Sequence, residues 1–184
     1  MNRGACHQRI FSDESDYQYF MSLLLDTRNL YSFIVHAYCL MTNHYHLLIE
    51  TKDEDISKIM KRINEFYTRY YNVKYGRDGA LFRGRFKSCE VLDDEYFLQT
   101  SRYICLNPVN ARIVELPEQY KWSSYSTLVG LKEVPITECD RTLKYFKDMN
   151  RQLYREFVES RIRYGIFEEQ IAKEMGEDEL WLPW

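Results

Sequence analysis

The 184-residue chain contains little of what marks the special classes of protein. It has only four prolines and seven glycines, so its composition indicates neither disorder nor a fibrous repeat. No run approaches the roughly 18 uncharged apolar residues that a membrane-spanning helix needs. The first eight residues lack the apolar core of a secretory signal. We therefore expect a cytoplasmic protein of one domain, or of one domain with a small extension.

Cysteines are also sparse, and their positions suggest no pairing. The five are Cys6, Cys39, Cys89, Cys105 and Cys139, and no two of them form a Cys-x-x-Cys pair. An odd, scattered set is typical of reduced thiols that pack as small apolar groups.

An excess of positive charge is missing as well, because the net charge is −3. The distribution is nevertheless uneven. Nine cations and two anions lie between Lys58 and Lys87, whereas six anions and one lysine follow Phe167. This asymmetry predicts either a basic binding face with an acidic tail or only a solvated surface.

Hydrophobic periodicity predicts helices separated by a β-hairpin. The hairpin has a short turn at 41–43. Asp93 is the expected cap of one helix and Pro108 its expected end. The predicted elements are helices at 13–26, 53–74, 93–107, 140–160 and 167–176, strands at 30–40 and 44–51, and an extended segment at 81–92.

The most informative pair of residues is His44 and His46. Side chains alternate along a strand, so these two imidazoles point the same way and Tyr45 points to the opposite face. Such a pair could share one divalent metal ion. It could equally be two packed or solvent-facing histidines.

A second pair lies on the predicted helix from Asp93. Tyr103 and Asn107 are four residues apart, which places them on one helical face. A tyrosine beside a metal ion could attack a phosphodiester, and an asparagine could add an oxygen ligand. On spacing alone, a half-buried aromatic and an ordinary helix-end residue are the simpler interpretations.

Basic residues around these pairs predict contacts with DNA. Arg83, Arg85 and Lys87 alternate along the extended segment and are interleaved with Phe82 and Phe86, a pattern that suits a phosphate backbone with nearby bases. Lys58 and Arg62 lie off the apolar stripe of their helix and face solvent or a ligand.

Four motifs in order and spacing resemble the REP-associated tyrosine transposases, which are HUH single-strand DNA transposases with one catalytic tyrosine. The resemblance covers roughly residues 2 to 130, and Asn2-Arg-Gly4 is also similar to this family. The motifs are Met41-Thr-Asn-His-Tyr-His-Leu-Leu-Ile, Leu81-Phe-Arg-Gly-Arg-Phe-Lys, Ser101-Arg-Tyr-Ile-Cys-Leu-Asn-Pro-Val-Asn-Ala-Arg112 and Trp122-Ser-Ser-Tyr125.

The resemblance implies a fold, a site and a reaction. The fold is α+β, with a ferredoxin-like antiparallel sheet and helices packed on it. His44, His46 and Asn107 would bind Mg²⁺ or Mn²⁺, and Tyr103 would be the nucleophile. Relatives cleave single-stranded DNA beside hairpins through a 5′-phosphotyrosine link and release a 3′-OH that can rejoin.

One departure from the family concerns the start of the chain. Family members usually carry a further strand before the Asn-Arg-Gly stretch, beside the metal-binding strand, and here Met1 comes directly before Asn2. We therefore expect the first central strand to be missing. A missed upstream start or a decayed copy would explain this more simply than a partner chain that fills the gap.

The resulting hypothesis is a metal-dependent, transposase-like endonuclease and strand transferase that acts on hairpin or single-stranded DNA. A non-cleaving hairpin-DNA-binding protein derived from a transposase is the alternative. Residues 1–132 would form the catalytic domain and residues 133–184 a helical extension. A homodimer is also compatible with the sequence.

Overall fold

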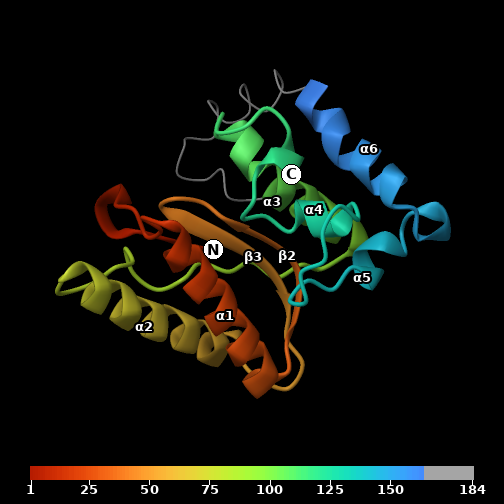
Figure 1. The fold of residues 1–184 in the computed structure, drawn as a ribbon. Helices are drawn as coiled ribbons and strands as arrows, with labels where there is room; N and C mark the ends of the chain where they lie inside the picture. Colours follow the sequence, from red (N-terminus) through yellow and green to blue (C-terminus); the bar gives the residue numbers. More distant parts are fainter. Residues whose placement is uncertain (164–184) are drawn as a thin grey trace.

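The computed structural model describes residues 1–163 as a three-stranded antiparallel sheet with helices on both faces. Helices α1 (Glu14–Tyr31) and α2 (Ile56–Tyr75) cover one face, and α3 (Asp94–Asn110) covers the other (Figure 1). The predicted α+β class with an antiparallel sheet is therefore confirmed. No helix in this part of the chain is long and apolar enough to cross a membrane.

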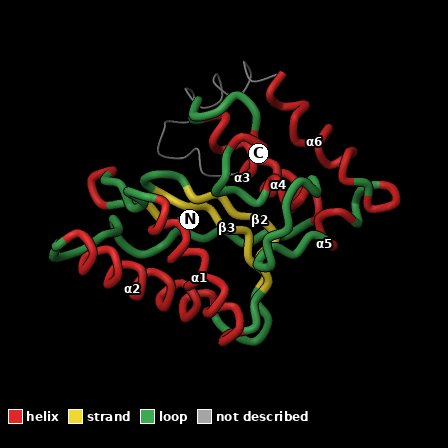
Figure 2. The backbone as a smooth tube through the Cα atoms, viewed as in Figure 1, coloured by secondary structure: helices red, strands yellow, loops and turns green. Residues whose placement is uncertain are grey.

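Strand β3 is the middle of the sheet, and it carries both histidines of the predicted site. It spans His44–Glu50 and pairs with β2 (Ile34–Leu40) from Leu40↔Tyr45 to Ile34↔Glu50. On its other side, the two-residue β1 (Asn2–Arg3) pairs with Tyr45 and His44. Figure 2 shows the strands as a curved layer between the two groups of helices. The predicted hairpin is confirmed, although β2 begins at Ile34 rather than Leu30.

The late start of β2 has a backbone cause. Helix α1 begins as predicted, with the Asp13 side chain accepting hydrogen bonds from the backbone N–H groups of Ser15 and Asp16. It then continues past the predicted end until Ser32 adopts a left-handed conformation and donates its N–H to the Arg28 carbonyl. Helix α2 ends in the same way at Gly76, whose φ of 58° suits glycine.

On the β1 side, no strand among residues 1–163 pairs with β3 after Tyr45, the partner of Asn2. The edge from His46 to Glu50 instead lines a cleft of about 560 Å³, which is closed on its other side by residues 86–91. An unpaired strand edge leaves backbone groups that a further extended segment could bond.

Two predictions about the second half of the chain are wrong in detail. Helix α3 does not end before Pro108 but runs to Asn110. The proline lacks an N–H, but the backbone N–H groups of Ala111 and Ile113 still bond to the Asn107 and Pro108 carbonyls. The predicted helix at 140–160 is interrupted, since Asp148 and Met149 have φ values of 56° and 52°. The elements are α5 (Asp140–Leu143), η3 (Lys147–Met149) and α6 (Arg151–Arg163).

The remaining short elements are η1 (Ala5–His7), η2 (Pro117–Gln119) and α4 (Tyr125–Leu128). The chain returns to the sheet after residue 132, where Glu138 donates its N–H to the Val35 carbonyl at 2.8 Å. The helix predicted at 167–176 lies outside the described residues.

Tyr154 fixes α6 against the outer face of α3. Its ring is fully buried, and its hydroxyl lies 2.7 Å from the Ser101 hydroxyl and 3.5 Å from the Cys105 sulfur. Ser101 and Cys105 are on the face of α3 that points away from the sheet, so this contact holds α3 from behind.

We expect Tyr154→Ala to lower the free energy of unfolding by about 3–5 kcal/mol, because it removes a buried ring. Tyr154→Phe keeps the ring and removes only a hydrogen bond, so a loss of about 1 kcal/mol is expected. Urea unfolding followed by circular dichroism measures both. Equal losses in the two variants would contradict the packing role of the ring.

Candidate active site

The two histidines of β3 lie on the sheet face that α3 covers. His44 Nε2 is 3.4 Å from Asn107 Oδ1, and the rings of His46 and Tyr103 meet edge to face with centroids 5.5 Å apart. Tyr45 points to the opposite face, where its hydroxyl donates to Asn64 Oδ1 of α2 at 2.6 Å. The predicted alternation is therefore confirmed.

Helix α3 supplies the other half of the site. Asp93 caps its first turn by accepting the Tyr96 N–H, as the sequence predicts. Tyr103 and Asn107 follow one turn apart, Tyr103 half-buried and Asn107 buried. One strand and one helix thus bring together the four residues that the sequence indicates.

The hydrogen bonds of His44 determine which nitrogen is free to bind a ligand. Nδ1 lies 2.7 Å from the side-chain oxygen of Asn43, so the ring donates its Nδ1–H there. A neutral imidazole has one N–H, and Nε2 is then an acceptor. It faces Asn107 Oδ1, which is also an acceptor. Two acceptors at 3.4 Å repel each other unless a cation or a proton lies between them.

At neutral pH, no proton lies between these two atoms, because His44 is not protonated there. Burial is the main cause that lowers the pKa of His44 to about 4, because a charged ring is poorly solvated there. Burial also lowers the pKa of His46 well below its usual value, with the neighbouring His44 adding to the effect. Both rings are neutral at pH 7, the form in which imidazole binds metals.

The donor set fits a divalent cation. Adjacent ligands about 2.1 Å from one ion lie about 3 Å apart, close to the separation of His44 Nε2 and Asn107 Oδ1. The Asn43 contact orients His44 in the way that second ligand shells commonly do. Within residues 1–163, neither ring nitrogen of the buried His46 has a hydrogen-bond partner, which leaves a nitrogen available as a ligand.

The set contains two imidazoles and an amide but no carboxylate. Within the described residues, no group of three or more His, Cys, Asp or Glu side chains could hold a metal ion. A cation bound by His44, His46 and Asn107 would keep its full charge, since all three donors are neutral. Imidazole nitrogens generally favour softer ions than Mg²⁺, whereas an amide oxygen suits hard ions such as Mg²⁺ and Mn²⁺.

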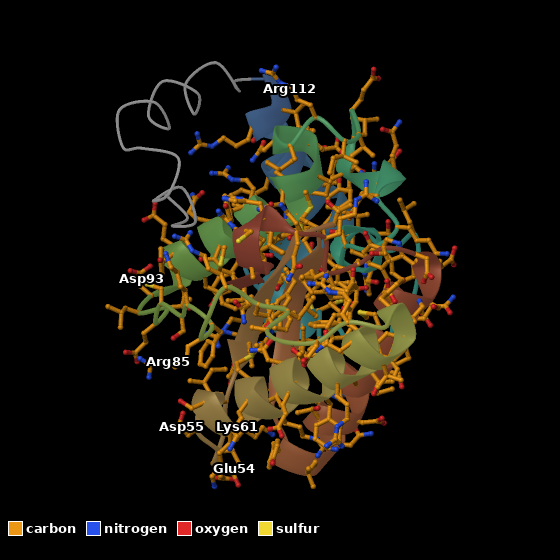
Figure 3. The ribbon with its side chains drawn as sticks, turned by 90° about the vertical axis from the view of Figure 1, so that its left-hand side faces the viewer. Glu54, Asp55, Lys61, Arg85, Asp93 and Arg112 are labelled. Carbon is orange, nitrogen blue, oxygen red and sulfur yellow. The ribbon has the colours of Figure 1, made fainter. Side chains whose placement is uncertain are left out.

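The predicted DNA-binding residues fall into two groups. Arg83, Arg85 and Lys87 are exposed on the segment between α2 and α3, and Figure 3 shows Arg85 extending outward from this segment. Lys58 and Arg62 lie on α2, on the face opposite His44. Lys58 pairs with Glu54 at 2.9 Å, and Arg62 lies over the Phe66 ring at 4.6 Å, so the structure does not bring these two to the site.

Two residues near the site were missed by sequence reasoning. Asn43 orients His44, and Arg3 is the direct partner of His44 across the β1–β3 pair. Asn43 precedes the His-Tyr-His run and Arg3 is part of the Asn-Arg-Gly stretch, so both stood in recognised motifs. Their roles depend on a side-chain contact and on a strand register that no spacing reveals.

Comparison with protein-family models gives one match, to the family described as "Transposase IS200 like", over residues 3–107. The match covers more than half of the chain and includes both histidines, Tyr103 and Asn107. The chain therefore belongs to the IS200-like transposase family.

Comparison with solved structures finds a similar fold in a REP-associated tyrosine transposase bound to a REP hairpin. The TM-score is 0.61 at 16% sequence identity, and the alignment covers 74% of this chain and 87% of that chain. This chain thus has the fold that its sequence motifs imply. A search of curated proteins finds no match.

Metal binding can be tested without any reaction. We expect Mn²⁺ at 100 times its dissociation constant to raise the unfolding free energy by about 2.7 kcal/mol, because the ion binds only the folded site. The double variant His44→Ala/His46→Ala should show no such shift in thermal unfolding.

The matched control is His7→Asn, which removes an exposed imidazole from a position where φ is 57°, a conformation that asparagine tolerates. It should keep the full Mn²⁺ effect. An equal shift in the double variant would show that the ion binds elsewhere.

Proposed function

We propose that this chain is a metal-dependent single-stranded DNA endonuclease and strand transferase, which cleaves beside DNA hairpins through a 5′-phosphotyrosine intermediate. The observation that carries the proposal is the pair of facing acceptors, His44 Nε2 and Asn107 Oδ1, next to Tyr103. The fold it shares with a transposase bound to a REP hairpin supports hairpin DNA as the ligand.

The proposed ligands of Mg²⁺ or Mn²⁺ are His44, His46 and Asn107. When bound, the cation would withdraw charge from a phosphate oxygen and stabilise the charge on the leaving oxygen. His44 is held in orientation by the Asn43 contact and by its strand neighbours on both sides, and the buried His46 follows it on the same face of β3.

Tyr103 is the proposed nucleophile. Its phenolic oxygen loses a proton and bonds to phosphorus, the bond from phosphorus to the 3′-oxygen breaks, and that oxygen takes up a proton. The downstream fragment is then linked to the protein through its 5′-phosphate, and the upstream fragment ends in a 3′-OH. Attack by a 3′-OH reverses the step and rejoins DNA. One phosphodiester replaces another, so no ATP is required.

The position of Tyr103 suits this role. It lines the 560 Å³ cleft together with His46, and its helix is held on the opposite face by Tyr154. A nucleophile on a supported helix keeps its orientation toward a bound strand, which lowers the entropic part of the barrier.

We expect the wild-type chain with Mn²⁺ and a single-stranded hairpin substrate to form a covalent protein–DNA adduct, visible as a shifted band on a denaturing gel. Tyr103→Phe should form none, because it lacks the attacking oxygen. Tyr31→Phe, a change in a partly exposed tyrosine at the end of α1, should form as much adduct as wild type. A folded, Mn²⁺-loaded wild type that gives no adduct on varied hairpins would refute the proposal.

One observation favours a second candidate, a hairpin-DNA-binding protein that no longer cleaves. Within residues 1–163, β3 has a strand neighbour on only one side from His46 to Glu50. The backbone at His46 is therefore less firmly held than the backbone at His44, which has a strand neighbour on both sides. Such a protein would bind DNA equally well as wild type and as Tyr103→Phe, and neither would form an adduct.

Both candidates require an electrostatic contact with the DNA backbone. Binding should weaken as salt rises, because neutralised phosphates release counterions. Arg85→Ala should reduce the slope of log K against log salt by about 1, the loss of one phosphate contact. Lys132→Ala, a change in an exposed lysine away from the site, should leave the slope unchanged in fluorescence anisotropy titrations. Binding that does not respond to salt would contradict both candidates.

The proposal includes three further expectations from the sequence. Residues 1–132 would form the catalytic domain, and residues 133–184 would be a helical extension. The five free thiols suit the cytoplasm. A homodimer is compatible with this function.

A further inference from the structure

Arg3 links the histidine site to the basic segment between α2 and α3. It is the direct partner of His44 in the β1–β3 register. On its other side, Arg83 donates its backbone N–H to the Arg3 carbonyl at 2.9 Å, next to the Gly4↔Phe82 bridge. His44, Arg3 and Arg83 are therefore cross-strand neighbours in one row.

Directly opposed residues in antiparallel strands project to the same face. Asn2 is the partner of Tyr45, and both are buried toward the α1 and α2 side; Phe82, opposite Gly4, is buried there too. The alternate residues Arg3 and Arg83 must then share the face of His44.

The backbone around Arg3 is closely constrained. A Cβ atom on Gly4 would lie 2.2 Å from the Gln8 carbonyl oxygen, so only glycine allows the chain to turn there. The Ala5 N–H donates to the Leu81 carbonyl at 2.9 Å, and the N–H of Lys87 donates to the Met1 carbonyl at 3.0 Å. These bonds hold the basic segment in register with β1.

The two arginines of this row have no carboxylate partner among the residues that the structure describes. Within residues 1–163, Arg85 also forms no ion pair with a carboxylate. Together with Lys87, these three arginines line a cleft of about 350 Å³. Two cations directly opposite each other across a strand pair are destabilising. An anion between Arg3 and Arg83 would remove that repulsion.

We infer that Arg3 and Arg83 together hold one backbone phosphate of the DNA strand, next to the phosphate that reaches Tyr103. This inference rests on the proposed function, because it takes single-stranded DNA as the ligand. Arginine matches the oxygens of a phosphate with two parallel hydrogen bonds. Neighbouring β-strands lie about 4.8 Å apart. A single DNA strand that crosses β3, β1 and the basic segment would therefore contact His44 first and then Arg3 and Arg83.

The experiment measures binding of hairpin DNA with a single-stranded tail, by fluorescence anisotropy, in a Tyr103→Phe background that prevents cleavage. Each tail phosphate is replaced in turn by an uncharged methylphosphonate. Arg3→Gln and Arg83→Gln should each weaken binding of unmodified DNA about tenfold, the effect of one charge-assisted contact. Lys132→Gln is the control and should change binding less than twofold.

At one tail position, the methylphosphonate should weaken binding by the parent protein about tenfold and by either arginine variant less than twofold. Such non-additivity identifies a direct partner, whereas a structural role of Arg3 would weaken binding to every DNA alike. Additive effects at all positions would overturn the inference, as would coupling of the two arginines to different phosphates. If Arg3→Gln does not fold, Arg83→Gln, on the exposed segment, carries the test alone.

This result is separable from the outcome for cleavage. An adduct with wild type but additive methylphosphonate effects would refute only the arginine pair. Absence of an adduct together with coupling at one phosphate would refute cleavage and retain the phosphate contact.

Discussion

The two-residue alternation of strand β3 is the constraint on which the rest of the structure depends. It places Tyr45 in the aromatic core against α2 and leaves His44 and His46 on the face that α3 covers. A slip of one residue in register would exchange these sets, burying imidazoles among apolar rings and exposing Tyr45. The large core contacts of Tyr45 therefore hold the orientation of the two neighbouring histidines, and the apolar core sets the geometry of the polar site.

The candidate site combines neutral donor groups with positively charged residues beside them. Its donors are neutral, burial lowers the pKa of both imidazoles and keeps them uncharged, and Arg3, Arg83 and Arg85 form no ion pair with a carboxylate among residues 1–163. Elsewhere in the protein, cations form ion pairs, as Lys74 does with Asp13 and Asp16. The contrast separates charges that stabilise the fold from charges available to an anionic strand. It also explains how a chain of net charge −3 can belong to a family of transposases.

Local patterns in the sequence predicted most of the fold, and they indicated the four candidate residues that the structure brings together. Asp13 and Asp93 gave the helix starts, because a capping side chain bonds to backbone only two or three residues away. Periods of two and of four residues gave the relations of His44 to His46 and of Tyr103 to Asn107. The failures came from non-local or conformational causes: the left-handed Ser32, Asp148 and Met149, the helical Pro108, and the pairing of Arg3 with His44. A register between residues forty apart cannot be read from spacing.

Helix α3 has two working faces, one toward His44 and His46 and the other toward Tyr154. A ligand that binds only when α3 is ordered shifts the equilibrium between ordered and disordered α3 toward the ordered state. The packing of α6 on the opposite face of α3 shifts the same equilibrium. The two are therefore thermodynamically linked, and the linkage is reciprocal. Selection on the affinity for such a ligand then acts also on residues 151–163, although none of them lines the candidate site. Helix α6 is therefore a place where this affinity can be changed without altering a residue of the candidate site.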